Sequence, residues 1–199
     1  SLTRTLTSAR VEMNPHQVNA ALFALKSPFS KGALLADEVG LGKTIEAGLV
    51  ISQRIAEGKR RILLIVPASL RKQWQQELQE KFSVPTMILD AAVVRQARKR
   101  GEDDIFKTTK MPVIMSYEYA ARIADELRVA QRWDLIVFDE AHRLRNVYKN
   151  EQNRGTSKRA QALADAFRDI PKILLTATPL QNSLLELYGL ISVIDDTHF

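Results

Sequence analysis

The sequence has 199 residues and no cysteine, with 29 Lys and Arg against 23 Asp and Glu, for a formal net charge of +6. This length fits one domain, or two small ones, and allows one substantial core. The lack of cysteine excludes a disulfide scaffold, a thiolate metal site and a cysteine nucleophile. The three histidines lie far apart in sequence, which does not favour a histidine-built metal centre. No apolar run approaches the about 20 residues of a membrane span. Residues 1–13 lack the apolar region of a secretory signal, so we expect a cytoplasmic protein without membrane contact.

Short apolar runs alternate with amphipathic segments along the chain. The runs are continuous, which is typical of strands buried on both faces, and they predict strands at Ala33–Leu35, Ile62–Val66, Met87–Leu89, Val113–Met115, Leu135–Phe138 and Ile173–Leu175. Apolar residues at helical spacing predict helices over 70–82, 160–167 and 184–191, the first with Ser69 as its N-cap. We therefore expect an α/β fold with a mainly parallel central sheet flanked by helices, whose ligands bind at the carboxyl ends of the strands.

A glycine-containing loop follows the first predicted strand. It runs Asp37-Glu38-Val39-Gly40-Leu41-Gly42-Lys43-Thr44 and leads into a helical pattern over 45–55. Gly40 and Gly42 let the backbone curl so that N–H groups point at a phosphate, and the helix N-terminus adds its positive dipole end. Lys43 would then reach the β- and γ-phosphates of a bound nucleotide, and the Thr44 hydroxyl would bind Mg²⁺. Since Asp37 stands where the first glycine is expected, an ordinary turn before a helix is the alternative.

An acidic pair follows the strand predicted at Leu135–Phe138, in the run Asp139-Glu140-Ala141-His142. A phosphate loop needs a second acid at a neighbouring strand end, and Asp139 suits a Mg²⁺ ligand that acts mostly through water. Glu140 is then placed to orient and deprotonate an attacking water. A solvated loop is the alternative, and His142 alone would more often be a structural histidine. Beside the acidic pair it is interpreted as part of the site, bonding toward the segment after Leu175.

These two motifs together resemble the Swi/Snf family of superfamily-two helicase-like ATPases, whose first motif also carries Asp in place of the first glycine. Further similar segments follow in the expected order, so the resemblance runs from about Asn14 to Phe199: Pro15-His16-Gln17 before the phosphate loop, Val66 to Leu70 with Trp74, Ile114 to Glu118, and Leu175 to Asn182. The stretch over 37–48 is most similar to bacterial members, among them the RapA-type RNA-polymerase-associated group and related phage or defence helicases. The resemblance thus implies a bacterial or phage-encoded protein.

The resemblance implies a RecA-like ATP-binding lobe over residues 14–199, after an N-terminal extension over 1–13. It implies ATP and Mg²⁺ as cofactors and Gln17 as the contact to the adenine base. Nucleotide binding is implied for Asp37, Glu38, Gly40, Leu41, Gly42, Lys43 and Thr44, with Thr44 and Asp139 as the Mg²⁺ ligands. Catalysis is implied for Lys43, Asp139 and Glu140. Coupling of the nucleotide to nucleic acid is implied for His142, Thr176 and Thr178.

Candidate nucleic-acid contacts fall into two groups. Pro67, Ser69 and Ser116 follow predicted strand ends, where N–H groups and hydroxyls hold phosphates without recognising base sequence. Arg143, Arg145 and Lys149 lie on a basic stretch over 143–159 beside the acidic pair. A second basic stretch, over 95–100, precedes the acidic run over 102–104, which weakens it as a contact. A solvated face is the alternative for both stretches, and we expect Trp74 to pack in the core.

The resemblance implies a DNA-dependent ATPase that moves along double-stranded DNA and displaces or remodels DNA-bound complexes. Its implied partners are duplex DNA, a second RecA-like lobe of the same parent chain, and RNA polymerase or another DNA-bound protein. Because the second lobe supplies arginine fingers in this family, we expect the 199 residues alone to bind ATP weakly and turn it over slowly. Two alternatives remain open: a strand-separating DNA or RNA helicase lobe, and a nucleotide-dependent module that docks onto another protein.

Overall fold

The computed structural model describes residues 32–36, 41–130, 132–147 and 156–176. In chain order its elements are β1 (Gly32–Ala36), α3 (Leu41–Ala56), β2 (Ile62–Val66), the 3₁₀ helix η1 (Ala68–Leu70), α4 (Arg71–Phe82), β3 (Met87–Ile88), α5 (Ala91–Lys99), α6 (Ile105–Thr108), β4 (Val113–Ser116), α7 (Tyr117–Arg122), α8 (Ala124–Ala130), β5 (Leu135–Phe138), the 3₁₀ helix η2 (Ala141–Val147), α9 (Thr156–Ala166) and β6 (Lys172–Thr176). Every strand predicted from the apolar runs is therefore present.

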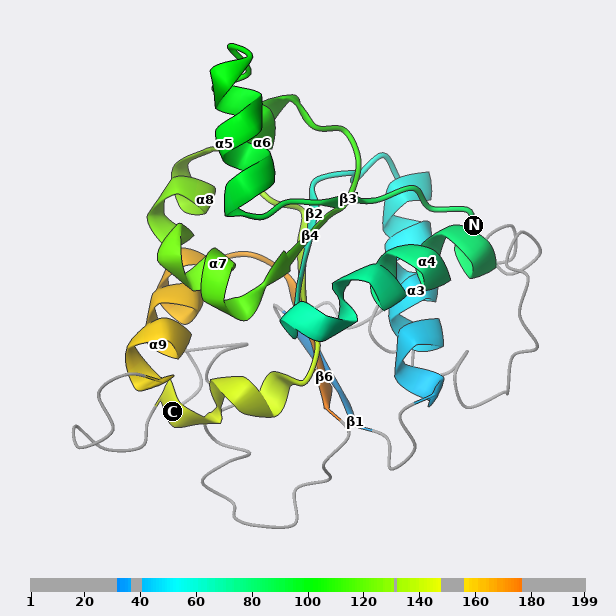
Figure 1. Cartoon of the computed structure of the whole chain (residues 1–199). Coiled ribbons are helices and arrows are strands. Elements are labelled where there is room, and N and C mark those ends of the chain that lie inside the picture. Colours follow the sequence, from blue (N-terminus) through cyan, green and yellow to red (C-terminus); the bar gives the residue numbers. More distant parts are fainter. Residues whose placement is uncertain (1–31, 37–40, 131, 148–155, 177–199) are drawn as a thin grey trace.

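The described strands form one six-stranded sheet in the order β1-β6-β5-β2-β4-β3. Every described pairing is parallel. All the strands therefore end at the same edge. Helices cover both faces, with α3 and α4 on one side and α7, α8 and α9 on the other (Figure 1). The predicted α/β fold with a mainly parallel, helix-flanked sheet is confirmed.

Alternate side chains of each central strand enter different cores, as the period of two in a strand requires. In β2, Leu63 and Ile65 join the core that includes residues of α5, α7 and α9. Ile62, Leu64 and Val66 of the same strand join the core that includes residues of α3 and α4. Both faces of β2 are buried, so its sequence is apolar at every position.

Helix α4 buries the predicted stripe, since Trp74, Leu78 and Phe82 are its buried residues. The prediction of Ser69 as its N-cap is wrong, because the N-cap position is Leu70 and no side chain caps the helix. Ser69 lies instead inside η1, so the chain enters α4 from a 3₁₀ turn in which the Leu70 N–H already donates to the Pro67 carbonyl.

The predicted helical stripe over 160–167 is also confirmed, because Ala160 and Leu163 of α9 and the following Phe167 are buried. The stripe over 184–191, the extension over 1–13 and the Pro15-His16-Gln17 segment lie outside the described residues. Among the described residues, none of the helices has both the length and the apolar character that crossing a bilayer requires.

Candidate functional site

The site lies at the edge of the sheet where β1, β5 and β6 end. The strand that carries the acidic pair, β5, was expected to lie directly beside β1. It does not, because β6 pairs with both β1 and β5 and separates them. Adjacent strands lie about 4.8 Å apart, so the ends of β1 and β5 are about two strand spacings from each other. The intervening strand ends in Thr176, which is opposite Ala36 in the parallel register and is almost fully buried. Thr176 thus lies beside the last described residue before the phosphate loop.

A small pocket of about 90 Å³ joins the two sequence motifs. One side is formed by Lys43 and Thr44, in the first turn of α3, and another by Asp139 and Glu140, directly after β5. Leu70 at the end of η1 and Gln73, Trp74 and Glu77 of α4 close the pocket. Residues separated by almost 100 positions in the chain therefore converge where α/β sheets bind ligands.

Lys43 is 5 % exposed, although lysine is almost never buried without compensating charge. Its position in the first turn of α3 adds the partial positive charge of the helix N-terminus to that of the ammonium group. Burial raises the pKa of the Asp139 carboxyl group, and the positive charge of Lys43 lies close enough to oppose part of that rise. The pocket therefore concentrates positive charge on one side and carboxylates on the other, as expected for a site that takes a phosphate with a metal ion.

Asp139 is held by hydrogen bonds to both of its carboxylate oxygens. Its Oδ2 accepts a 2.8 Å bond from the indole Nε1 of Trp74, and its Oδ1 accepts a 2.8 Å bond from the backbone N–H of Glu140. Burial raises the pKa of the Asp139 carboxyl above its ordinary value, and these two hydrogen bonds oppose that effect. The carboxylate is thus oriented by two fixed donors in a largely desolvated place.

Tyr117 supports the same turn from the other side. Its hydroxyl donates a 2.6 Å hydrogen bond to the backbone carbonyl of Asp139. Burial raises the pKa of this hydroxyl well above its ordinary value, and the negative charge of Asp139 raises it further. The phenol therefore remains a donor, and both the side chain and the main chain of Asp139 are fixed by buried aromatic residues.

Glu140 has a left-handed backbone conformation, with a φ of 52°. Non-glycine residues in this region are uncommon, and an observed case at a polar pocket points to a functional constraint. The carboxylate Oε2 of Glu140 lies 3.1 Å from Nδ1 of His142. His142 therefore contacts the neighbouring acid. The bond expected from His142 toward the segment after Leu175 stays a prediction, since only Thr176 of that segment is among the described residues.

The donor set in the pocket fits Mg²⁺. The Thr44 hydroxyl and the Asp139 carboxylate are hard oxygen donors, and both line the pocket. Within the described ranges, no group of three or more His, Asp or Glu side chains could hold a metal ion by itself. Mg²⁺ typically uses one or two protein oxygens together with water and substrate phosphates, so this sparse set suits it better than an ion that needs a full protein cage.

Other predicted site residues are only partly placed. Leu41 and Gly42 begin α3, and Arg145 lies in η2. The predicted residues Gln17, Asp37, Glu38, Gly40, Lys149 and Thr178 lie outside the described residues.

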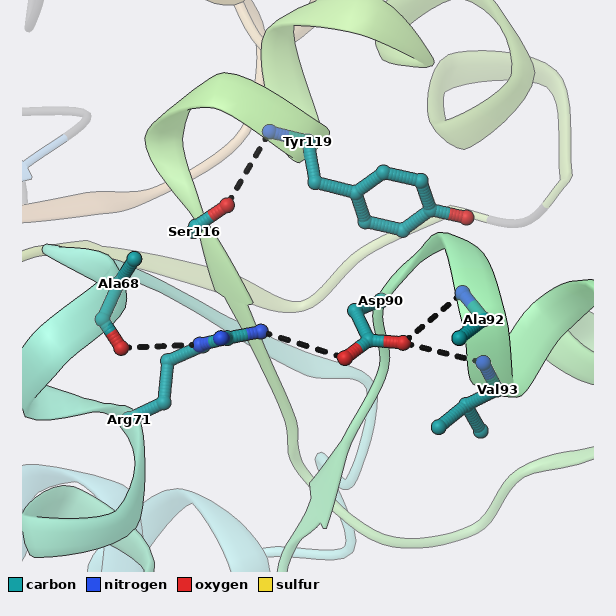
Figure 2. Close-up of polar contacts among 7 residues, drawn as sticks. All are labelled: Ala68, Arg71, Asp90, Ala92, Val93, Ser116 and Tyr119. Carbon is teal, nitrogen blue, oxygen red and sulfur yellow. Dashed lines mark hydrogen bonds and ion pairs between the residues drawn. The ribbon is translucent and has the colours of Figure 1, made fainter.

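The predicted nucleic-acid contacts differ in exposure. Ser69 is exposed after the end of β2, whereas Pro67 is buried. Ser116 is buried at the end of β4, and its hydroxyl accepts a 3.2 Å bond from the Tyr119 N–H, so it is the N-cap of α7 (Figure 2). Arg143 is half-exposed, with its guanidinium 5.8 Å from the centre of the Tyr117 ring.

Sequence reasoning missed the roles of Trp74 and Tyr117 at the site. Trp74 was correctly expected in the core, where it is 4 % exposed, but its indole also reaches Asp139. The N–H group of a buried indole normally has a hydrogen-bond acceptor. The signal available in the sequence was therefore that a tryptophan expected in the core requires an acceptor.

Comparisons with known proteins agree with this fold. A family model described as the SNF2-related domain matches residues 16–199. Among solved structures, the SWI2/SNF2 ATPase core of Sulfolobus solfataricus in complex with dsDNA matches with a TM-score of 0.72 and 21 % identity, over 96 % of this chain and 37 % of that one. At this identity the match shows a shared fold.

Two bacterial relatives are similar in sequence. The uncharacterized ATP-dependent helicase YqhH of Bacillus subtilis (strain 168) is 36 % identical over 186 residues, which are 92 % of this chain and 29 % of that protein. The RNA polymerase-associated protein RapA of Serratia proteamaculans (strain 568) is 35 % identical over 199 residues, which are 98 % of this chain and 20 % of that protein. The chain thus spans less than a third of the length of either relative.

Proposed function

Because the chain belongs to the SNF2-related domain family, we propose that it is the ATP-binding lobe of a DNA-dependent ATPase that translocates on double-stranded DNA. The observation that carries this proposal is the convergence of Lys43, Thr44, Asp139 and Glu140 on one pocket at the carboxyl edge of the sheet. We place the lobe at residues 14–199, after an extension over 1–13. It would act with a second RecA-like lobe of the same parent protein.

Each side chain of the pocket has a role in this chemistry. The Lys43 ammonium group would bind the terminal phosphates of ATP, assisted by the N-terminal dipole of α3. Thr44 and Asp139 would hold Mg²⁺, which when bound neutralises charge on the phosphates. Glu140 would orient the attacking water and accept its proton, and its contact with His142 would fix the carboxylate for that task.

Thr176 supports a coupling role, because its strand ends between the phosphate loop and the acidic pair. A change at the nucleotide would reach this strand end directly. We propose that Thr176, with His142 and Thr178, transmits the state of the nucleotide to the bound nucleic acid.

Duplex DNA as the substrate is supported by the net charge of +6 and by the solved relative, which was determined with dsDNA. Such a motor would displace or remodel DNA-bound complexes. RNA polymerase is one candidate complex, since the similar RapA proteins are described as RNA polymerase-associated.

The substrate is tested by measuring ATP hydrolysis by the protein that contains this lobe, with equal masses of duplex DNA, single-stranded DNA and RNA side by side. We expect duplex DNA to give the largest stimulation. Stronger stimulation by a single strand would instead support a strand-separating helicase. Capture of a protein partner without any stimulated hydrolysis would support a docking module.

A further inference from the structure

A second hollow lies on the flank of the domain, between α5 on one side and α7 and α8 on the other (Figure 1). Its volume is about 740 Å³, and it opens widely to solvent. It shares no lining residue with the pocket at Lys43 and Asp139. This hollow, here called the basic groove, contains most of the basic stretch over 95–100, which the nucleotide site does not use.

The basic groove carries an excess of positive charge. Its lining includes Arg95, Arg98 and Lys99 from α5 and Arg122 from α7, against the single carboxylate of Glu126. Glu126 forms an ion pair with Arg98. Within the described part of the chain, no ion pair joins Arg95, Lys99 or Arg122 to a carboxylate, so three cations of the groove are uncompensated.

The acidic run over 102–104 does not neutralise the groove. Glu102 pairs with Arg100 at 3.2 Å, and Asp104 pairs with Lys107 at 3.5 Å. Neither Arg100 nor Lys107 lines the groove. From the sequence alone, the acidic run over 102–104 weakened the basic stretch over 95–100 as a nucleic-acid contact. In the fold that objection no longer holds.

The two walls of the groove are fixed at their starting points. The Asp90 carboxylate caps α5 by accepting 3.0 Å bonds from the N–H groups of Ala92 and Val93, and it also pairs with Arg71 of α4 at 3.5 Å (Figure 2). The Ser116 hydroxyl caps α7. Both helices therefore begin from defined positions beside the carboxyl ends of β3 and β4.

The spacing of the cations suits a chain of repeated negative charges. Arg95 and Lys99 are four residues apart on α5, which is about 6 Å along the helix axis and on one face. Across the groove, the Arg122 guanidinium lies 5.3 Å from the centre of the Tyr119 ring, which orients it. The groove thus presents positive charge from both walls.

We propose that the basic groove binds the phosphodiester backbone of duplex DNA, as a contact separate from the ATP pocket; this rests on the proposed DNA-dependent function. Arginine and lysine at a groove bind phosphates without recognising base sequence. An acidic protein partner fits less well, because the hot spots of protein interfaces combine arginine with accessible tryptophan and tyrosine side chains. The aromatic residue of this groove, Tyr119, is 7 % exposed.

The test replaces Arg95→Gln and Lys99→Gln together and measures binding of a fluorescein-labelled 30-base-pair duplex by anisotropy over a range of salt concentrations. The matched control is Arg60→Gln with Lys110→Gln, which removes the same charge at exposed residues before β2 and β4, at the opposite edge of the sheet. Loss of two phosphate contacts lowers the slope of log K against log salt by about 2, and we expect affinity at low salt to fall about tenfold. Arg122→Gln alone should lower the slope by about 1.

Equal affinity and slope for the groove variant and the matched control would overturn the groove proposal. Poly-glutamate as a competitor gives a second arm. Its competition for the wild type is compared with that of an unlabelled duplex of equal charge. If the two competitors displace the labelled duplex equally, the groove is a site for acidic protein and the DNA assignment is wrong. A wild-type chain that binds no duplex at low salt would instead contradict the proposed function, so the two failures are distinguishable.

Discussion

The indole Nε1 of Trp74 donates a 2.8 Å hydrogen bond to Oδ2 of Asp139, and this bond joins residues 65 positions apart in the sequence. It connects α4, which packs on the face of the sheet covered by α3, to the turn after β5 that carries the acidic pair. Asp139 is 9 % exposed, so bulk water does not easily replace a hydrogen-bond donor that its carboxylate loses. The position of this proposed Mg²⁺ ligand therefore depends on a residue that the core of the domain holds in place.

Trp74→Phe removes the indole N–H from a buried carboxylate. Hydrogen bonds to charged groups contribute about 1.5–3 kcal/mol, so we expect the free energy of unfolding to fall by about 2–3 kcal/mol, measured by urea denaturation. Trp133→Phe is the matched control, since its Nε1 donates 3.0 Å to the neutral carbonyl of Leu127 in the other core. If the free energy of unfolding falls no more for Trp74→Phe than for Trp133→Phe, the bond to Asp139 contributes no more stability than a bond to a neutral carbonyl.

Tyr117→Phe removes the donor to the carbonyl of Asp139. We expect a loss of about 1 kcal/mol at pH 7 from one neutral hydrogen bond. Burial raises the folded-state pKa of Tyr117 above its unfolded value, so between these values the folded state binds more protons and stability falls as the pH rises. The wild type should therefore lose its advantage over Tyr117→Phe as the pH rises above about 10, the unfolded value.

The pH dependence of this pair is measured as the difference in free energy of unfolding between wild type and Tyr117→Phe from pH 8 to pH 11. A difference that stays constant or grows over this range would contradict the buried, protonated state of the phenol.

Gly48→Ala is expected to destabilise the packing of α3 on α4. A Cβ at Gly48 would lie 2.2 Å from the Phe82 ring, closer than carbon atoms approach. Overpacking of a core costs about 1–3 kcal/mol, and a contact this short belongs at the upper end of that range, above the about 1 kcal/mol by which alanine favours a helix over glycine. We expect a net loss in urea denaturation, because the Phe82 ring is only 5 % exposed and therefore has little space into which it could turn away.

Phe82→Leu supplies the control for this clash. Introduced into the Phe82→Leu background, Gly48→Ala should cost less than it does in the wild type, and the two substitutions should couple in a double-mutant cycle. Additive effects would mean that the glycine is required for a reason other than the approach of this ring.

Glu140→Gln keeps the size of the side chain and removes its capacity to accept a proton. We expect ATP affinity to stay within about twofold, while hydrolysis by the protein that contains this lobe falls by about 10²–10⁴, the usual contribution of a general base. The measurement pairs an ATP-binding titration with a steady-state hydrolysis assay. Normal turnover by this variant would show that another group activates the water.

Much of the fold could be predicted because its signals are local. The run Ile62–Val66 is apolar at every position, which indicates a strand buried on both faces, and the structure buries all of it. The four-residue spacing of Trp74, Leu78 and Phe82 likewise predicted the buried face of α4. Lys43, Thr44, Asp139 and Glu140 were assigned to one site from their motifs, and they line one pocket.

The parts that could not be predicted depend on contacts distant in sequence. The order of the strands in the sheet, with β6 between β1 and β5, is not encoded by any local sequence pattern. Tyr117 and Asp139 are 22 positions apart, and only the alignment of β2, β4 and β5 brings the hydroxyl to the carbonyl. Serine is a residue type common at N-caps, but Ser69 lies inside a 3₁₀ turn that leads into α4 without a side-chain cap.

The central claim is that ATP binds at the pocket shared by Lys43 and Asp139, and Trp74, which lines that pocket, can report on it directly. The chain has two tryptophans, so Trp133→Phe leaves Trp74 as the single emitter. In that background, titration with Mg-ATP should change the emission saturably. Adding Lys43→Ala should abolish the change, and adding Lys110→Ala, at an exposed lysine, should preserve it. An emission that does not respond to ATP, or a response that survives Lys43→Ala in a folded variant, would contradict the claim.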